Sequence, residues 1–301
     1  MRRRVVVFGS LNMDLVVRVP RMPQAGETLT GHGFLGNPGG KGANQAVACA
    51  RQGAAVSMVG RVGADAFGAE LREGLLAQGI DVSGVGIADG VSTGVATILV
   101  DDAAQNCIAV VPGANALVTQ NDAEALRPVL EGAALLLLQL EVPMPSVLRA
   151  AQVAREAGCT VLLNPAPAQA LPAALWPLID ILVLNETEAR MLSGLASVDM
   201  GNAAEAAALL ARRGPREVIV TLGADGVVWH SPLGVQRLAA QKVKAVDTTA
   251  AGDTFIGALA ALRVEGRPME EALAHAIRAA AICVTRPGAQ ASMPTRAEVE
   301  G

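Results

Sequence analysis

The chain has 301 residues, which is enough to bury a large core in one α/β domain or in two smaller ones. It contains four Phe, two Trp and no Tyr, and its formal net charge is -4. Aromatic stacking platforms and a basic surface are both missing from this composition, so we expect no nucleic-acid partner.

Short β-branched runs alternate with Ala-rich amphipathic segments along most of the chain. We predict strands at residues 5–8, 55–59, 135–138, 160–163, 181–184 and 218–221. We predict helices at residues 41–52, 65–78, 145–157, 186–192, 203–213, 253–263 and 269–284. This alternation predicts a doubly wound α/β fold, with a mostly parallel sheet and helices on both faces.

Two stretches depart from this alternation and have the pattern of hairpins. Residues 15–19 with 27–35, and residues 93–100 with 105–111, are strand-like runs separated by turn residues. They predict a small β-sheet that stands off the main body. No internal repeat or flexible linker divides the chain, so residues 1–301 are interpreted as a single domain.

The cysteines and the N-terminus bear on the cellular compartment. Cys49, Cys107, Cys159 and Cys283 are widely spaced and are interpreted as reduced core residues. The apolar run that follows Met1 is too short for a signal peptide. Since no run approaches the ~18 apolar residues of a membrane span, we expect a cytoplasmic protein without membrane contact.

The segment at residues 246–255 places two alanines and a glycine directly before an acid, Asp253, and a helix-patterned run follows. Such a start leaves the backbone N–H groups of Ala251, Gly252 and Asp253 free to hold an anion. A carboxylate beside an anion hole suggests phosphoryl transfer, with Asp253 a weak base because the helix dipole favours its ionised form. The alternative is an ordinary acid in a first helical turn.

Polar side chains follow several predicted strands. Asn12 and Asp14 come after the first strand, Glu141 follows the strand at residues 135–138, and Asn44 lies in the first turn of a helix that a glycine-rich turn introduces. A carboxylate accepts hydrogen bonds from two hydroxyls, whereas an amide both donates and accepts. Each residue alone is consistent with a cap, but together they predict a polyol pocket.

Neither standard nucleotide loop fits the sequence. Residues 31–36 match G-x-G-x-x-G, but a proline and two more glycines precede any helix, whereas that fingerprint must open one. Residues 36–42 resemble a P-loop but are one residue short, with Gly42 where Ser or Thr binds magnesium. A nicotinamide-dependent enzyme is therefore disfavoured.

Two further strand ends carry polar residues. Asn185 and Glu188 have the spacing of a capping box, which by itself explains the sequence. The functional alternative places them near phosphates and magnesium-bound water, because magnesium keeps several of its waters in proteins. Residues 221–226 form a glycine loop at another strand end.

The order of these blocks resembles the ribokinase family of small-sugar kinases, which also includes adenosine kinase and fructokinases. The resemblance runs end to end through residues 9–14 (GSLNMD), 39–45 (GGKGANQ), 139–141 (QLE), 164–167 (NPAP), 185–188 (NETE), 221–223 (TLG), 247–255 (DTTAAGDTF) and 285–290 (TRPGAQ). It implies ATP-dependent phosphorylation of a sugar, and the second and last blocks favour O5 of ribose.

The resemblance also implies roles for individual residues. Ribose would be held by Asn12, Met13, Asp14, Gly40, Lys41, Gly42, Ala43, Asn44 and Glu141. The nucleotide would contact Asn185, Thr221, Leu222, Gly223, Ala224, Asp225, Gly226, Gly252, Asp253 and Ile277. Asp253 would be the catalytic base, with Ala250, Ala251 and Gly252 forming the phosphate hole, and Glu188 would hold magnesium through water.

A monovalent cation, K⁺, is the other cofactor that the resemblance implies. Its positions would be Asp247, Thr249, Cys283, Arg286, Gly288 and Ser292, several of them through backbone carbonyls. The hairpin regions at about residues 11–35 and 91–111 would form a lid and a homodimer interface. Ile277 stands where the family often has His or Asn beside the adenine, and Pro287 replaces a more usual Lys.

Other functions are also compatible with the sequence. The substrate of such a kinase could be deoxyribose, fructose or a nucleoside instead of ribose. A sugar-binding protein on a degenerate kinase scaffold is a further alternative, which the retention of Asp253, Asn44 and Glu188 disfavours.

Overall fold

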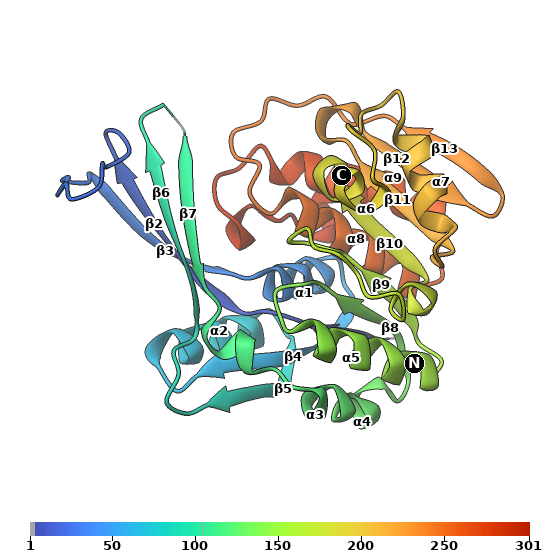
Figure 1. The fold of residues 1–301 in the computed structure, drawn as a ribbon, viewed down its shortest axis with the longest axis horizontal. Helices are drawn as coiled ribbons and strands as arrows, with labels where there is room; N and C mark the ends of the chain where they lie inside the picture. Colours follow the sequence, from blue (N-terminus) through green and yellow to red (C-terminus); the bar gives the residue numbers. More distant parts are fainter. Residues whose placement is uncertain (1–3, 104) are drawn as a thin grey trace.

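The computed structural model describes residues 4–103 and 105–301, so the first three residues of the chain and position 104 in the predicted second hairpin lie outside the described part. A large α/β body carries a second, smaller sheet that stands out from one side (Figure 1). Within the described residues, no helix is long and apolar enough to cross a membrane.

The body is built on a nine-stranded sheet in the order β13-β12-β11-β10-β9-β8-β1-β4-β5. Its strands are β1 (Arg4–Phe8), β4 (Ala55–Gly63), β5 (Asp81–Ala88), β8 (Ala133–Leu138), β9 (Thr160–Leu163), β10 (Ile181–Asn185), β11 (Glu217–Thr221), β12 (Val227–Ser231) and β13 (Gly234–Leu238). Only β12 and β13, at one end of the sheet, are antiparallel to their neighbours. The predicted doubly wound, mostly parallel sheet is confirmed.

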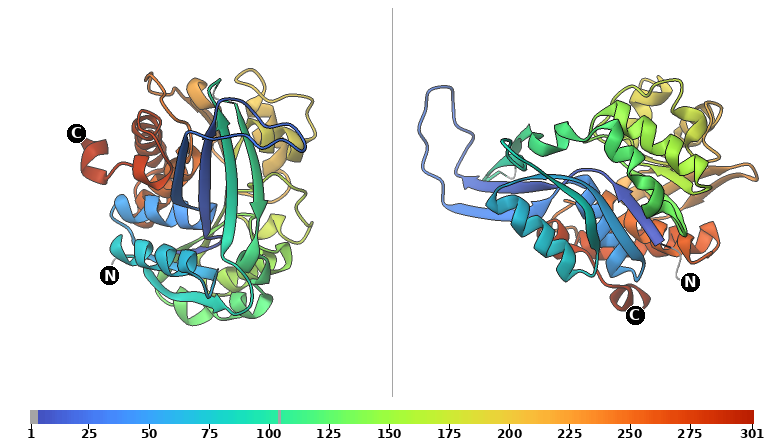
Figure 2. Two further views of the ribbon diagram at one scale, coloured as in Figure 1. Left: turned by 90° about the vertical axis from the view of Figure 1, so that its left-hand side faces the viewer. Right: turned by 90° about the horizontal axis from the view of Figure 1, so that it is seen from below.

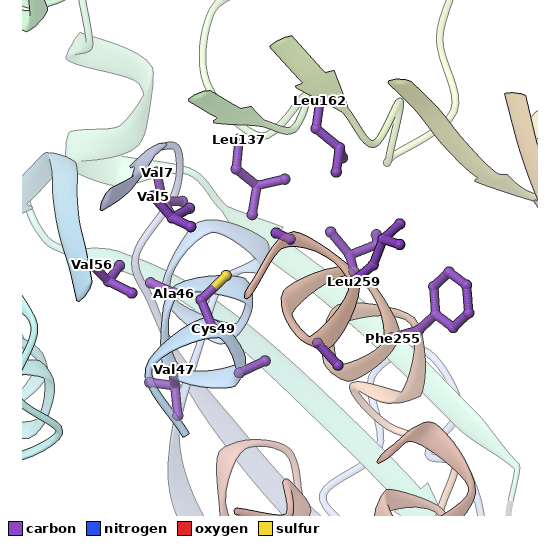
Figure 3. Close-up of a cluster of buried hydrophobic side chains, with 14 of the residues drawn as sticks. Val5, Val7, Ala46, Val47, Cys49, Val56, Leu137, Leu162, Phe255 and Leu259 are labelled. Atoms are coloured by element: carbon purple, nitrogen blue, oxygen red, sulfur yellow. The ribbon is translucent and has the colours of Figure 1, made fainter. Parts of the chain in front are cut away.

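Helices cover both faces of this sheet because side chains along each strand alternate between them. Val5 and Val7 of β1 pack toward α1 (Lys41–Arg51) and α8 (Ala251–Val264), as Figure 3 shows, whereas Val6 and Phe8 belong to the core on the other face. The first face also carries α2 (Ala66–Ala77), α9 (Met269–Cys283) and α10 (Arg296–Glu300). The second carries α3 (Gln120–Glu124), α4 (Leu126–Leu130), α5 (Met144–Glu156), α6 (Glu186–Ser193) and α7 (Ala203–Ala211).

The second sheet has the order β3-β2-β6-β7 and is seen face-on in Figure 2, left. Its strands are β2 (Asn12–Val19), β3 (Gly33–Gly39), β6 (Gly94–Asp101) and β7 (Asn106–Val111). The strand predicted at residues 27–35 is β3, and it begins and ends later than predicted. Its pairing with β2, in which Asn12 lies opposite Gly39, extends β3 up to the start of α1. Residues 20–32 form a long loop instead (Figure 2, right).

Several sequence predictions need correction. Cys107 is exposed on β7, since every residue of that strand is exposed and its apolar character does not imply a covered face. The other three cysteines are buried, and none of the four is in a disulfide. The predictions missed β5, whose Gly84 and Gly86 weaken the strand pattern, and the hairpin of β12 and β13.

Candidate active site

The predicted ligand residues meet where the winding of the sheet reverses. β1 lies between β4 and β8, and the chain adds later strands first on the β4 side and then on the β8 side. Open α/β sheets bind ligands outside the carboxyl ends of their strands at such a reversal. Asn12 follows β1 and Glu141 follows β8, so both lie at this edge.

Asn12 and Asp14 belong to β2, where the second sheet begins. The Oδ1 atom of Asn12 accepts a hydrogen bond from Nδ2 of Asn115 at 2.7 Å, which orients the Asn12 amide. Asn115 is itself fixed, because it accepts from the Leu11 N–H and donates to the Leu11 carbonyl, both at 3.0 Å. Met13, by contrast, points into the hydrophobic core, so only its backbone can face a ligand.

The carboxyl group of Asp14 has a raised pKa. Burial, together with the nearby carboxylates of Glu141 and Asp253, raises the pKa of its carboxyl to about 7, although the Lys41 ammonium opposes this rise. Its side chain accepts no hydrogen bond from the described residues. The carboxyl oxygens of Asp14 can therefore accept hydrogen bonds from a polyol, and the ionised carboxylate accepts more of them than the protonated form.

Glu141 is held by the start of α1 and by Ser10. Oε2 of Glu141 accepts hydrogen bonds from Ser10 Oγ at 2.5 Å and from the Lys41 N–H at 3.0 Å. The N–H groups of Gly42 and Ala43 also bond to Ser10, through its Oγ at 3.2 Å and its carbonyl at 2.9 Å. These two N–H groups therefore hold α1 in place and are not free for a ligand.

Asp253 lies at the centre of the site and is only 8% exposed. Its Oδ2 accepts from Nδ2 of Asn44 at 3.1 Å, and its Oδ1 accepts from Nε2 of Gln45 at 2.9 Å. Burial raises the pKa of Asp253, and the nearby Lys41 ammonium and the two amides oppose this rise. At this depth the loss of hydration opposes the helix-dipole effect on which the expectation of a weak base rests, and the role of Asp253 as a base stays a prediction.

Lys41 supplies positive charge among these acids. Burial alone would lower the pKa of its ammonium group, but the carboxylates of Asp253, Glu141, Glu188 and Asp14 raise it. Lys41 therefore stays protonated and lines the same cavity as Asp253.

The N-terminus of α8 is where the anion hole was predicted, and its N–H groups differ from the prediction in one respect. The Ala251 N–H bonds to the Thr248 carbonyl at 3.3 Å, so it is less free than predicted. The N–H groups of Gly252 and Asp253 have no acceptor among the described residues. Ala250 holds a left-handed conformation with φ of 60°, rare for a non-glycine residue, and this conformation turns the chain into the helix.

A cavity of about 200 Å³ opens at this helix start, which is room for phosphate groups and not for a whole nucleotide. The residues around it come from β10, β11, α1, α6 and α8 and from the segments after β9 and before α8. They include Lys41, Asn164, Asn185, Glu188, Thr221, Ala250, Ala251, Gly252 and Asp253. The predicted phosphate and magnesium residues are thus brought together on one cavity wall.

Asn185 and Glu188 do form the capping box that the spacing indicated. The Asn185 N–H and Nδ2 donate to the two carboxylate oxygens of Glu188 at 2.9 and 3.1 Å, and the Glu188 N–H donates back to Asn185 Oδ1 at 2.9 Å. Burial raises the pKa of Glu188, although the hydrogen bond from the Asn185 N–H and the Lys41 ammonium oppose this rise. Since both residues also line the cavity, capping and ligand binding are compatible here.

The remaining nucleotide residues do not all reach this cavity. Thr221 lines it, whereas Leu222 is buried and residues 223–225 form an exposed turn next to it in the chain. Gly226 has φ of 104°, and a Cβ there would lie 2.1 Å from the Leu238 carbonyl, so the turn requires glycine. Ile277 is partly buried and packs against the core.

Asp247 ties together the two loops of the predicted cation site. Its Oδ1 accepts from the Thr249 N–H and its Oδ2 accepts from the Gly288 N–H, both at 2.9 Å. Burial alone would raise the pKa of Asp247, but these hydrogen bonds outweigh burial and hold it below its usual value. Asp247 therefore stays ionised and holds the two loops beside α8 together through these hydrogen bonds.

Cys283 and Ser292 pack behind these loops, with Sγ and Oγ 3.1 Å apart. Cys283 also accepts from Thr254 of α8 at 3.2 Å, which connects the loops to this helix. The Arg286 side chain instead pairs with Glu298 of α10 at 2.8 Å, so only its backbone is available to the loops.

Several polar residues that hold the site have no role among the sequence predictions. Ser10, Gln45, Gln139, Asn115 and Asn164 are all buried and hydrogen-bonded to site residues or to one another. Four of them lie in blocks that carried the family resemblance, and that position was the available signal. Asn115 lies in none of these blocks and becomes visible only in the fold.

Comparison with known proteins identifies relatives of this chain along its whole length. A family model described as pfkB family carbohydrate kinase matches residues 2–296, and the chain belongs to that family. A ribokinase of Haemophilus influenzae is 42% identical over 299 residues, which cover 99% of this chain and 97% of that protein. A deoxyribokinase of Salmonella typhi is 37% identical over 292 residues, covering 97% and 95%.

Among solved structures, Arabidopsis thaliana ribokinase complexed with ribose and ATP superposes with a TM-score of 0.92. It is 34% identical in sequence, and the match covers 100% of this chain and 98% of that chain. The predicted family resemblance is confirmed.

Proposed function

We propose that this protein transfers the γ-phosphoryl group of ATP to O5 of D-ribose, giving ribose 5-phosphate and ADP. The observation that carries the proposal is the position of Asp253, buried between a cluster of polyol-binding groups and the unpaired N–H groups at the start of α8. The similarity to ribokinases along the whole chain supports ribose as the sugar.

The sugar side would use Asn12, Asp14, Asn44 and Glu141 for the hydroxyls, with Gly40 allowing close approach. A Cβ at Gly40 would lie 2.7 Å from the Asn12 nitrogen, so only glycine fits beside this residue. Asp253 would accept the O5 proton while O5 bonds to the γ-phosphorus and the bond to the ADP oxygen breaks. The transition state of phosphoryl transfer is loose, so alignment matters more than strong deprotonation.

Phosphate charge would be stabilised at the start of α8. The N–H groups of Gly252 and Asp253, which have no acceptor among the described residues, would donate to the transferring phosphoryl group, and the Lys41 ammonium would add positive charge. The adenine would lie beyond the cavity, toward residues 222–226 and Ile277, since the cavity itself is too small for a nucleotide.

Magnesium fits this site as an ion held mainly by ATP. No cluster of three or more acidic, His or Cys residues in residues 4–103 and 105–301 forms a direct metal site. Glu188 keeps acceptor capacity on both carboxylate oxygens and lines the cavity, so it would hold the ion through water. When bound, magnesium would neutralise charge on the β- and γ-phosphates.

The substrate is tested by measuring ADP release with a panel of ribose, deoxyribose, fructose, adenosine and related compounds. We expect the highest kcat/KM with ribose and a lower value with deoxyribose. A clear preference for another compound would replace ribose, and measurable binding without turnover of any compound would favour a non-catalytic sugar-binding protein.

Ribose affinity is expected to depend on pH through Asp14. Its carboxyl has a pKa of about 7 in the free protein, and the ionised form accepts more hydrogen bonds from hydroxyls than the protonated form. Affinity should therefore rise as pH increases from 5 to 7, by at most about tenfold per pH unit, and level off above 7. Calorimetric titration without ATP measures this.

The matched variant for this titration is Asp14→Asn, which cannot ionise. It should bind ribose more weakly and with a flatter pH dependence. A wild-type affinity that stays constant from pH 5 to 8 would show that Asp14 does not titrate in contact with the sugar.

We further propose a K⁺ site formed by backbone carbonyls near Asp247, Thr249 and Gly288. The ionised Asp247 and the carbonyl oxygens of these loops suit a large cation with weakly held water. Potassium should raise turnover above the level in sodium at equal ionic strength, because it would stabilise the loop that leads into α8. An unchanged rate after dialysis from potassium into sodium would contradict this site.

The second sheet is proposed as a lid over the sugar and as a homodimer interface. Phe34, Leu35, Ile108, Val110 and Val111 are each more than half exposed on β3 and β7, an apolar content typical of interfaces. Light scattering should therefore give twice the chain mass of 30.6 kDa. A monomeric mass at assay concentrations would contradict the dimer.

A further inference from the structure

A chain of buried amides lies behind the carboxylate of Asp253. Nε2 of Gln45 donates to Oδ1 of Asp253 at 2.9 Å and to Oδ1 of Asn164 at 3.2 Å. Oε1 of Gln45 accepts from Nε2 of Gln139 at 2.6 Å. Gln45 and Gln139 are fully buried and Asn164 is 6% exposed, so water does not compete for these bonds.

These bonds leave only one orientation for the Gln45 amide. If the amide were turned by 180°, its oxygen would face the carboxylate of Asp253 and the carbonyl of Asn164. Asn164 cannot reverse in turn, because its Nδ2 donates to the Val183 carbonyl of β10 at 3.0 Å. The Val183 carbonyl therefore fixes the Asn164 amide, and Asn164 in turn fixes the Gln45 amide that donates to Asp253.

The opposite oxygen of Asp253 is oriented in the same way. Nδ2 of Asn44 donates to Oδ2 at 3.1 Å, and Oδ1 of Asn44 accepts from Nε2 of Gln290 at 3.2 Å. Asn44 faces the sugar side and has a proposed role there, whereas Gln45 lies on the buried side and has none.

We propose that Gln45 is a positioning residue for the catalytic base, which fixes the carboxylate plane of Asp253 and favours its ionised form. Gln139 acts one step further back by holding the Gln45 amide in the required orientation. This role rests on the proposed function of Asp253, and it concerns catalysis more than sugar binding.

Charged groups from several surrounding elements also affect the pKa of Asp253, in addition to the hydrogen bond from Gln45. Lys41 of α1 favours the ionised form, whereas Glu141 after β8, Asp14 of β2 and Glu188 of α6 disfavour it. Burial also disfavours ionisation. Among these opposing effects, the Gln45 hydrogen bond stabilises the charged form directly, so its loss should raise the pKa of Asp253.

The test compares Gln45→Met, an unbranched replacement of similar length, with the matched variant Gln52→Met. Gln52 follows α1 and is 1% exposed, and its amide makes two buried hydrogen bonds, to His275 and to the Pro294 carbonyl, away from the site. Both variants lose buried hydrogen bonds, so both should lose stability. Only Gln45→Met removes a hydrogen bond to Asp253.

For Gln45→Met we expect kcat to fall by about 10- to 100-fold, with KM for ribose changed less than about threefold. The acid limb of its pH profile for kcat should move to higher pH, because Asp253 must lose its proton to act as a base. Gln52→Met should keep the wild-type kcat and acid limb. Equal losses in both variants, or an unmoved acid limb in Gln45→Met, would overturn the proposal.

A second readout does not depend on turnover. The side-chain carboxyl of Asp253 can be titrated by ¹³C NMR and assigned by its loss in Asp253→Asn. Its midpoint should be higher in Gln45→Met than in the wild type, and Gln139→Met should move it in the same direction by a smaller amount. Unchanged midpoints in both variants would refute the role of Gln45 even if no tested sugar is phosphorylated.

Discussion

Replacing Asp253 by Asn is expected to lower kcat for ribose phosphorylation at least ~100-fold, the lower end for a positioned acid-base group. The variant cannot accept the O5 proton. Its amide nitrogen would also face a donor on either side, because Asn44 and Gln45 both donate to Asp253. Ribose binding should be largely retained, since Asn12, Asp14 and Glu141 are unchanged.

The measurement is steady-state kinetics together with calorimetric ribose binding. The matched control is Glu205→Gln, which removes an exposed acid from the first turn of α7. If Asp253 were an ordinary first-turn acid, the two substitutions would have similar small effects on stability and none on turnover. Near-normal turnover in Asp253→Asn would remove Asp253 from the mechanism.

Gly252→Ala is expected to lower kcat by about 100-fold while leaving the protein at least as stable as the wild type. Gly252 does not need positive φ, and a Cβ there meets no atom within 4 Å, so the fold tolerates the methyl group. Alanine also favours a helix over glycine by roughly 0.5–1 kcal/mol. The cavity at the start of α8 is lined by Gly252, so the methyl group would occupy space that the transferring phosphoryl group needs.

Gly74→Ala is the matched control for this substitution. Gly74 is an exposed glycine inside α2, and a Cβ there also meets no atom within 4 Å. Both variants should show an equal or higher Tm, but only Gly252→Ala should lose activity, a loss near the value for removing one oxyanion-hole donor. Full activity in Gly252→Ala would place the phosphate elsewhere.

The α/β class and most buried elements could be predicted from the sequence because their patterns are strong. The strand at residues 160–163 was predicted with its observed bounds, and α9 with an error of one residue at its end. Elements at the edges were harder to predict. β5 carries glycines on a half-exposed edge, and the start of β3 depends on its pairing with β2 and not on its own composition.

The site was predicted as a set of residues and not as an arrangement. Strand ends in a parallel sheet share one edge, so Asn12, Glu141 and Asn185 could be grouped from their positions after predicted strands. Which of the polar atoms near them are already occupied could not be predicted. The family resemblance implied that Gly42 and Ala43 hold ribose, but their N–H groups are bonded to Ser10.

The sequence by itself determined the family, the order of the blocks and the identity of the acid at the start of α8, because these depend on residue types and spacing along the chain. Only the tertiary structure shows the surroundings of that acid. Burial among residues distant in sequence raises the pKa of Asp253, and Gln45 and Asn44 orient its carboxylate. Desolvation and hydrogen-bond direction depend on distances between elements, which a pattern along one chain does not contain.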